Sequence, residues 1–322
     1  MDLTVRQEPT GTGTLRVLDL SNIQDQHARS LSAFFEMVDE HDLPPPHLLD
    51  GFVFGIIFYA MRLGQGIRVH GAMSLDALRN LNEFQEAWTL WKGDRYKKVD
   101  ILPDELVESS AVSPAPEALA AFSGGIDSIF TVLRHANAKL GTASYALKRS
   151  LVMVHGFDVP LNDHYQLDSL RKRVRPFVDE MNLSLRLIRT NLKKLELQVW
   201  QDSFTAQLAC CLHNYSHECG YGLIGSSEPY DGLVLPWGSN PATDYLLSGA
   251  AFRIVHDGAG YSRTQKVEEI IKNSTATAVA KVCWEGTETY KNCGVCEKCV
   301  RTQLNFLAAG EPMPACFDAP LD

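Results

Sequence analysis

The chain lacks several features that define whole classes of protein. It has no long apolar run: in its 322 residues the longest, residues 51–61, is bracketed by Asp50 and Arg62 and is too short to cross a bilayer. Residues 1–4 show neither the basic nor the apolar segment of a secretory signal. We therefore expect a cytoplasmic protein with no membrane partner.

An excess of positive charge is also absent. The chain has 30 Lys and Arg residues against 39 Asp and Glu residues, a formal net charge of −9. Because a large nucleic-acid surface usually needs a basic face, nucleic acid is not an expected partner. The densest basic stretch, residues 171–175, falls in an expected helix, and we interpret it as a solvated helix face.

Four of the eight cysteines are clustered near the C-terminus with the spacing C-x9-C-x2-C-x2-C: Cys283, Cys293, Cys296 and Cys299. In a reducing compartment such a cluster favours metal binding over disulfides. The spacing fits a tetrahedral structural zinc site, whereas the usual run of an iron–sulfur protein differs. Four nearby cations would offset the thiolate charge: Lys281, Lys291, Lys298 and Arg301.

The most informative stretch is residues 119–128, LAAFSGGIDS. It predicts a short buried strand, a tight glycine turn and the start of a helix. Adjacent glycines let the backbone approach a ligand closely, and the free amides at a helix start favour an anion. Asp127 could hold Mg²⁺ beside phosphates. No Lys follows the glycines, so this is not a P-loop, and it is not a GxGxxG fingerprint. An ordinary turn with Ser and Asp caps is the alternative.

Short apolar strands alternate with helices after a small-residue linker at 108–116, which indicates a doubly wound parallel α/β sheet. We expect three regions: a mixed α+β N-terminal region of unassigned role (1–112), an α/β domain (113–280) and a cysteine-containing segment (281–322). Among the expected elements are a helix over 25–39 and a strand over 278–282.

In a parallel sheet the residues that follow each strand meet at one edge. There the candidates for substrate contacts are Glu228 and Asp257, and the long loop 225–249 adds Trp237, Thr243 and Asp244. The alternative for His155 and His256 is a purely structural role. The alternative for Trp237 is that it anchors the loop. The capping-box pattern from Ser262 to Gln265 predicts a helix start with Arg263 and Lys266 on its first turn.

Ser-Gly-Gly-Ile-Asp-Ser after a strand resembles the pyrophosphate loop of the N-type ATP pyrophosphatases. Together with the four cysteines, it resembles the zinc-containing 7-cyano-7-deazaguanine synthase family of queuosine biosynthesis, over about residues 117–310. The resemblance implies an adenine nucleotide alpha hydrolase-like fold, structural Zn²⁺, and ATP bound with Mg²⁺. The expected catalytic residues are Asp127, Arg263 and Lys266, the last two because cations on the first turn of a helix that faces the crevice could neutralise the charge on a leaving pyrophosphate. The expected ATP-binding residues are Phe122, Ser123, Gly124, Gly125, Asp127, Ser128, Val154 and His155.

The expected function is that of an ATP-dependent ligase that adenylates a small carboxylate acceptor, such as a 7-deazapurine, and releases pyrophosphate. One alternative is a tRNA-modifying relative that performs thiolation or lysidine formation, which would need a basic RNA surface. Another is a non-catalytic ATP-binding sensor or partner subunit. The sequence leaves open the acceptor and the assembly state, for which a homodimer is one option.

Overall fold

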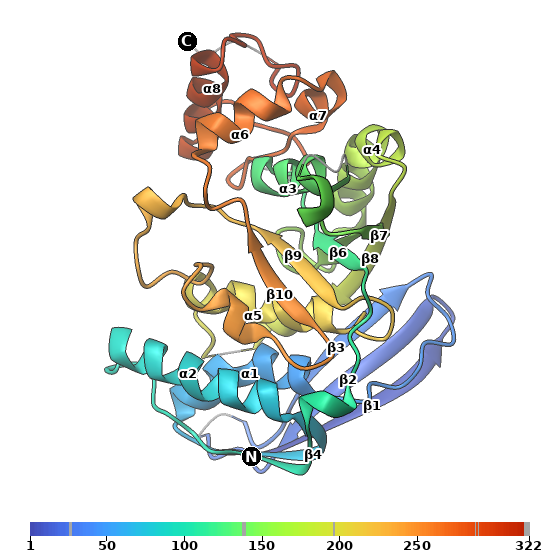
Figure 1. The fold of residues 1–322 in the computed structure, drawn as a ribbon, viewed down its shortest axis with the longest axis vertical. Helices are drawn as coiled ribbons and strands as arrows, with labels where there is room; N and C mark the ends of the chain where they lie inside the picture. The colour runs from blue at the N-terminus through green and yellow to red at the C-terminus, as the bar shows by residue number, and fades with distance from the viewer. Residues whose placement is uncertain (26–27, 137–139, 196, 287, 289, 319–322) are drawn as a thin grey trace. The chain divides into compact units, whose positions relative to one another are not determined.

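A computed structural model describes residues 1–322 except 26–27, 137–139, 196, 287, 289 and 319–322. The fold is mixed α/β, and the chain divides into two compact units (Figure 1). Unit 1 contains Met1–Glu117, Leu187–Gly222 and Val234–Val255. Unit 2 contains Ala118–Arg186, Leu223–Leu233 and His256–Asp322. The first segment of unit 1 ends near the expected boundary at 112, but two later segments join it, so the units do not follow the chain in order.

The sheet of unit 1 is mixed in direction. Its strands lie in the order β8-β3-β2-β1-β4-β5, and β8 contributes its residues 187–190. β1 pairs with β2, β2 with β3 and β3 with β8 in antiparallel fashion, while β1–β4 and β4–β5 are parallel. The bounds are β1 Asp2–Thr10, β2 Gly13–Ser21, β3 Leu31–Val38, β4 Ile67–Ser74, β5 Ile101–Val107 and β8 Ser184–Thr190.

Three helices pack in unit 1: α1 (Asp50–Leu63), α2 (Leu75–Trp91) and α5 (Trp200–His213). α1 is apolar on all sides, and its residues 50–61 are all buried, which is the pattern of a core helix. α1 lies close to α5 at Gly55. A Cβ added at Gly55 would come within 2.8 Å of the Cys210 sulfur of α5, so only a glycine allows this close approach. The apolar run that is too short for a bilayer is therefore a buried core helix.

The expected helix over 25–39 is wrong for residues 31–38, which form β3. Phe35 and Met37 are fully buried and pair across to Arg16 and Thr14 of β2. This segment contains aromatic and β-branched residues, which pack well on a pleated surface, so sheet pairing outweighs its helical spacing. Residues 26–27 of that expected helix lie outside the described residues.

Unit 2 contains β6 (Ala118–Ala121) and β7 (Leu147–His155), which pair in parallel. Parts of three further strands belong to it: residues 184–186 of β8, 223–225 of β9 (Tyr221–Gly225) and 256–257 of β10 (Arg253–Asp257). The strand order is β10-β9-β6-β7-β8. From β6 the chain adds β7 and β8 on one side of the sheet, and it then adds β9 and β10 on the other side of β6.

The helices of unit 2 are α3 (Ile126–Ala136), α4 (His164–Glu180), α6 (Arg263–Ile270), α7 (Ser274–Val279) and α8 (Glu297–Ala308). The expected strand over 278–282 is wrong, because α7 extends to Val279 and is capped at its start by the Asn273 side chain. Short 3₁₀ helices occupy Ser109–Ala111, Gly141–Ala143, Leu192–Lys194, Tyr230–Gly232 and Asp244–Leu247. Among the described residues, no helix combines the length and apolarity needed to span a membrane.

A buried ionic cluster inside unit 1 gives a stability prediction. Asp202, 2% exposed, accepts hydrogen bonds from Lys92, from Arg95 at 3.1 Å and from the Tyr96 hydroxyl at 2.7 Å. We predict that Asp202→Asn lowers the free energy of unfolding by roughly 2 kcal/mol, because hydrogen bonds to a buried charge are lost. Urea unfolding followed by circular dichroism measures it.

The matched control is Glu86→Gln, which breaks an ion pair with Lys98 in which both side chains are about half exposed. Solvent screening makes such a pair worth less than about 1 kcal/mol. Equal losses for the two variants would contradict the importance of the buried cluster.

Candidate functional site

The glycine turn joins the end of β6 to the start of α3 in unit 2. The backbone is fixed on the strand side, where the Phe122 amide donates to the Val152 carbonyl at 2.9 Å and the Phe122 ring stacks on Phe177. Gly124 has a φ of +77°, and an added Cβ would lie 2.8 Å from Val174 of α4. Only glycine fits this position without strain. The predicted strand–turn–helix is confirmed.

The turn leaves backbone amides at the start of α3. The first helical hydrogen bond runs from Ile129 N to Gly125 O at 2.9 Å, so the amides of residues 126–128 precede the helical ladder. The Ser128 hydroxyl donates to the same Gly125 carbonyl at 3.0 Å, and Gly125 N reaches Ser123 Oγ at 3.4 Å. The amides of residues 126–128 and the Ser123 hydroxyl form a donor set suited to an anion.

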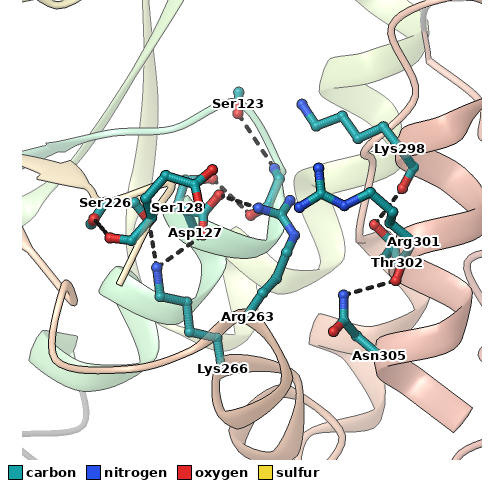
Figure 2. A network of polar contacts seen from close by, with 12 residues as sticks. Ser123, Asp127, Ser128, Ser226, Arg263, Lys266, Lys298, Arg301, Thr302 and Asn305 are labelled. Atoms are coloured by element: carbon teal, nitrogen blue, oxygen red, sulfur yellow. Dashed lines mark hydrogen bonds and ion pairs between the residues drawn. The ribbon is translucent and has the colours of Figure 1, made fainter. Parts of the chain in front are cut away.

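Asp127, Arg263 and Lys266 are brought together by α3 and α6 (Figure 2). Lys266 Nζ lies 3.0 Å from Asp127 Oδ1, and Arg263 Nη1 lies 3.1 Å from Oδ2. Lys266 also donates to the Ser226 carbonyl just after β9. The capping box of Ser262 and Gln265 is confirmed, and it sets the start of α6 so that both cations lie on its first turn.

The electrostatics of this cluster keep Asp127 ionised. Burial favours its neutral form, but the charges of Arg263 and Lys266 outweigh that effect and hold the pKa of Asp127 below its ordinary value. Lys266 is almost fully buried, whereas Asp127 and Arg263 are each about one-fifth exposed. The carboxylate and the guanidinium thus remain accessible to a ligand.

Two further cations reach this cluster from α8. Lys298 contributes to the lowered pKa of Asp127, and Figure 2 shows Lys298 and Arg301 extending from α8 toward Arg263. The one ion pair of Arg301 among the described residues, with Glu297 at 3.5 Å, is largely exposed and therefore weak. From sequence these two residues were assigned to the thiolates. Their i, i+3 spacing on a helix was the signal for a shared face.

The remaining expected ATP contacts lie at the end of β7. Because Ala121 pairs with Val152 in parallel register, Val154 and His155 continue β7 at the end of the strands where Ser123 lies. His155 is buried, and its Nε2 lies 2.8 Å from the Pro160 carbonyl. His155 thus has a structural contact, and its role in ATP binding stays a prediction.

The expected substrate residues are divided between the units. Glu228 and Asp257 belong to unit 2, and Trp237, Thr243 and Asp244 to unit 1. In unit 1 the Asp244 carboxylate accepts from Ser239 Oγ and Asn240 N, and Trp237 packs edge-on against Phe204.

In unit 2 the buried Asp257 accepts from Thr131 Oγ1 at 2.8 Å and faces His135 Nε2 at 3.1 Å. The Asp257 carboxylate is thus used within the fold. Burial favours the neutral acid, but these neighbours outweigh that effect and lower the pKa of Asp257. Its substrate role stays a prediction, and the same holds for the other four residues.

The four clustered cysteines form a candidate metal centre. Their sulfur atoms all lie within 4.8 Å of one another, and the pairs Cys283–Cys296 and Cys293–Cys299 are each 3.9 Å apart. Disulfides are excluded, since they need about 2.05 Å. A tetrahedral site with metal–sulfur bonds of about 2.3 Å gives sulfur separations of about 3.8 Å. The four thiols can therefore hold one metal ion.

The segment that leads into this centre is tied to the glycine turn and to α4. Lys281 N donates to Gly124 O at 2.8 Å. Arg173 of α4, expected to be a solvated charge, instead directs its guanidinium at backbone carbonyls: those of residues 278, 279, 280, 290 and 316. The metal centre and the turn therefore share one continuous framework within unit 2.

No protein-family model, curated protein or solved structure matches the chain.

We predict that the purified protein carries one metal ion per chain, and that Cys296→Ser loses it. A closed site of four thiolates contributes directly to folding, so the variant should also lower the melting temperature of the protein. Elemental analysis and a thermal melt measure the two effects. The control is Cys316→Ser, a buried thiol outside the cluster, which should keep the metal. A metal-free wild-type protein would contradict the assignment.

Proposed function

We propose that the protein is an ATP-dependent ligase of the N-type ATP pyrophosphatase kind, similar to the 7-cyano-7-deazaguanine synthases. It adenylates a small carboxylate acceptor, such as a 7-deazapurine carboxylate, and releases pyrophosphate. The observation that carries the proposal is the placement of Arg263 and Lys266 on Asp127, beside the amides of the glycine turn. These groups combine anion donors, two cations and one carboxylate at a strand end.

The strand order of unit 2 supports this proposal. Counted from β6, the order β8-β7-β6-β9-β10 reads 3-2-1-4-5, which is the order of doubly wound sheets. In such sheets ligands bind where the order reverses, beyond the carboxyl ends of the strands. The turn after β6 and Ser226 after β9 flank that reversal.

The charge around the turn suits a triphosphate. Asp127 is one negative charge among four cations, Arg263, Lys266, Lys298 and Arg301, so the cluster is positive overall. The turn amides would bind the β- and γ-phosphates, and the cations would stabilise the charge that develops on pyrophosphate as it leaves. Each Asp127 oxygen keeps a second lone pair, which would allow Mg²⁺ to bind there with the nucleotide.

The chemical step follows from this arrangement. A carboxylate oxygen of the acceptor attacks the α-phosphorus, and the bond from that phosphorus to the β-bridging oxygen breaks. Pyrophosphate leaves with the electron pair, held by Arg263 and Lys266. The acyl-adenylate is then opened by a nucleophile such as ammonia, and AMP leaves with one oxygen of the acceptor.

We propose that the metal of the cysteine centre is structural zinc. The four thiolates lie close enough together to complete a tetrahedral shell around Zn²⁺, which would leave no open position for a substrate. The centre would anchor the start of α8, whose N-cap is Cys296, and thereby the helix that carries Lys298 and Arg301. Iron with inorganic sulfide in the purified protein would overturn this identification.

We predict that Asp127→Asn reduces turnover by about 10²-fold or more, because the carboxylate that holds Arg263 and Lys266 in place is lost. The variant should remain folded at the assay temperature, which circular dichroism checks, although its melting temperature should fall because the almost fully buried Lys266 loses its carboxylate partner. The matched control is Asp168→Asn on the exposed surface of α4, which should retain full activity. Pyrophosphate release in the presence of an acceptor measures turnover, and wild-type turnover in Asp127→Asn would refute the assignment.

We predict that ATP is converted to AMP and pyrophosphate once an acceptor is present. With an acceptor whose carboxylate carries ¹⁸O, one label should appear in AMP, and mass spectrometry detects it. Formation of ADP and phosphate would indicate a kinase-like site. Tight ATP binding with no products for any acceptor would favour a sensor, and turnover only with tRNA would favour an RNA-modifying enzyme.

A further inference from the structure

The side chain of Asn292 satisfies every hydrogen-bonding position of its amide. Its Oδ1 accepts from Val282 N at 2.8 Å and from Cys283 N at 3.2 Å. Its Nδ2 donates to Ala280 O and to Cys316 O, each at 2.9 Å. An asparagine amide offers two donors and two acceptor lone pairs, so none is left over. The side chain is buried, 7% exposed, which makes each of these bonds costly to lose.

One of these bonds acts on a peptide group that also contacts the glycine turn. The carbonyl of Ala280 and the amide of Lys281 belong to the same planar peptide, and in a trans peptide they point in opposite directions. Asn292 holds the carbonyl end. The amide end donates to Gly124 O at 2.8 Å. The orientation of this peptide is therefore fixed between Asn292 and the turn.

The same reasoning extends to the next peptide group. Gly124 O and Gly125 N belong to one peptide, so a carbonyl turned toward Lys281 directs the Gly125 N–H to the opposite side. There it meets Ser123 Oγ at 3.4 Å, a long and weak hydrogen bond. This donor is thus aimed into the turn and is available to a stronger acceptor.

We propose that Asn292 is a positioning residue that aims the Gly125 N–H at a phosphate oxygen, through the peptides 280–281 and 124–125. Asn292 directly precedes the cysteine ligand Cys293, so it connects the metal centre to the anion-binding turn. The identity of the ligand as a pyrophosphate group rests on the proposed function.

The size of the effect follows from a second donor. Arg173 Nη2 also reaches Ala280 O, at 3.0 Å, and remains when the Asn292 donor is removed. The peptide would then be held less firmly but not released. We expect the hydrogen bond from the Gly125 N–H to the phosphate oxygen to be lost. The loss of one well-made hydrogen bond corresponds to about a tenfold weaker affinity for pyrophosphate.

The primary variant is Asn292→Asp, which keeps the shape and the acceptor for Val282 N but replaces the Nδ2 donor to Ala280 O and Cys316 O by an oxygen. The control is Asn273→Asp, the same change at the cap of α7, where the capping oxygen is retained. Inorganic pyrophosphate with Mg²⁺ is titrated by calorimetry. We expect the dissociation constant to rise about tenfold in Asn292→Asp and to stay unchanged in the control, with one metal ion per chain in both.

The amide signal of Gly125 gives an independent readout. In protein labelled with ¹⁵N-glycine, this signal should move in unliganded Asn292→Asp and stay in place in Asn273→Asp. A Gly125 signal and a pyrophosphate affinity both unchanged in Asn292→Asp would overturn the inference. If the wild type binds neither pyrophosphate nor ATP, the proposed function fails, while the Gly125 signal still decides the role of Asn292.

A second pair of variants decides the matter if Asn292→Asp loses its metal or fails to fold. Lys281→Pro removes the N–H that reaches Gly124, and Lys281→Gln removes the same charge but keeps the N–H. Ala280 has φ −53° and ψ 126°, a conformation that a following proline accepts. We expect pyrophosphate to bind about tenfold more weakly to Lys281→Pro than to Lys281→Gln. Equal affinities would overturn the inference.

Discussion

The pairing of one carboxylate with two cations organises the candidate site. Asp127 lies on the first turn of α3, and Arg263 and Lys266 lie on the first turn of α6, so the ion pairs fix the starts of two helices against each other. Lys266 then connects to the Ser226 carbonyl after β9. Because Lys266 is buried, its charge would be costly without these partners. The same contacts leave Arg263 accessible. In this cluster the buried Lys266 therefore contributes to stability, and the accessible Arg263 is available to a ligand.

Local signals in the sequence predicted the parts of the site well. The double glycine, the capping box and the cysteine spacing each depend on a few neighbouring residues, and each has the expected local geometry. Asp127 was predicted to act with Arg263 and Lys266, although 136 and 139 residues separate them, because strand ends of a parallel sheet converge.

The sequence did not reveal features that depend on tertiary partners. Residues 31–38 have no local pattern that excludes a helix, and they form a strand because β2 and β8 offer pairing on both sides. Lys298 and Arg301 were assigned to nearby thiolates, since their neighbours in sequence are cysteines. Asn292 went unnoticed, because its importance lies in backbone groups that its own sequence context does not identify.

A division of the sequence into consecutive regions also did not predict unit 1, which contains three separate segments of the chain. Its buried Arg16 donates to the Asn214 carbonyl, 198 residues away, and burial lowers the pKa of Arg16 to about 10. The core of this unit therefore needs residues from the first third and from the second half of the sequence. Such long-range contacts make folding slow, because the closure of large loops precedes the contacts that stabilise them.

The contacts of Arg173 bear on how this protein tolerates change during evolution. Within the described part of the chain its hydrogen bonds all go to main-chain carbonyls, which every amino acid supplies. Substitutions at residues 278–280 and 316 therefore leave this anchor intact as long as the backbone keeps its path. Arg173 itself has no equivalent substitute, since only a guanidinium presents donors in a planar fork to several acceptors at once. The residues that supply the carbonyls can therefore vary, whereas Arg173 cannot.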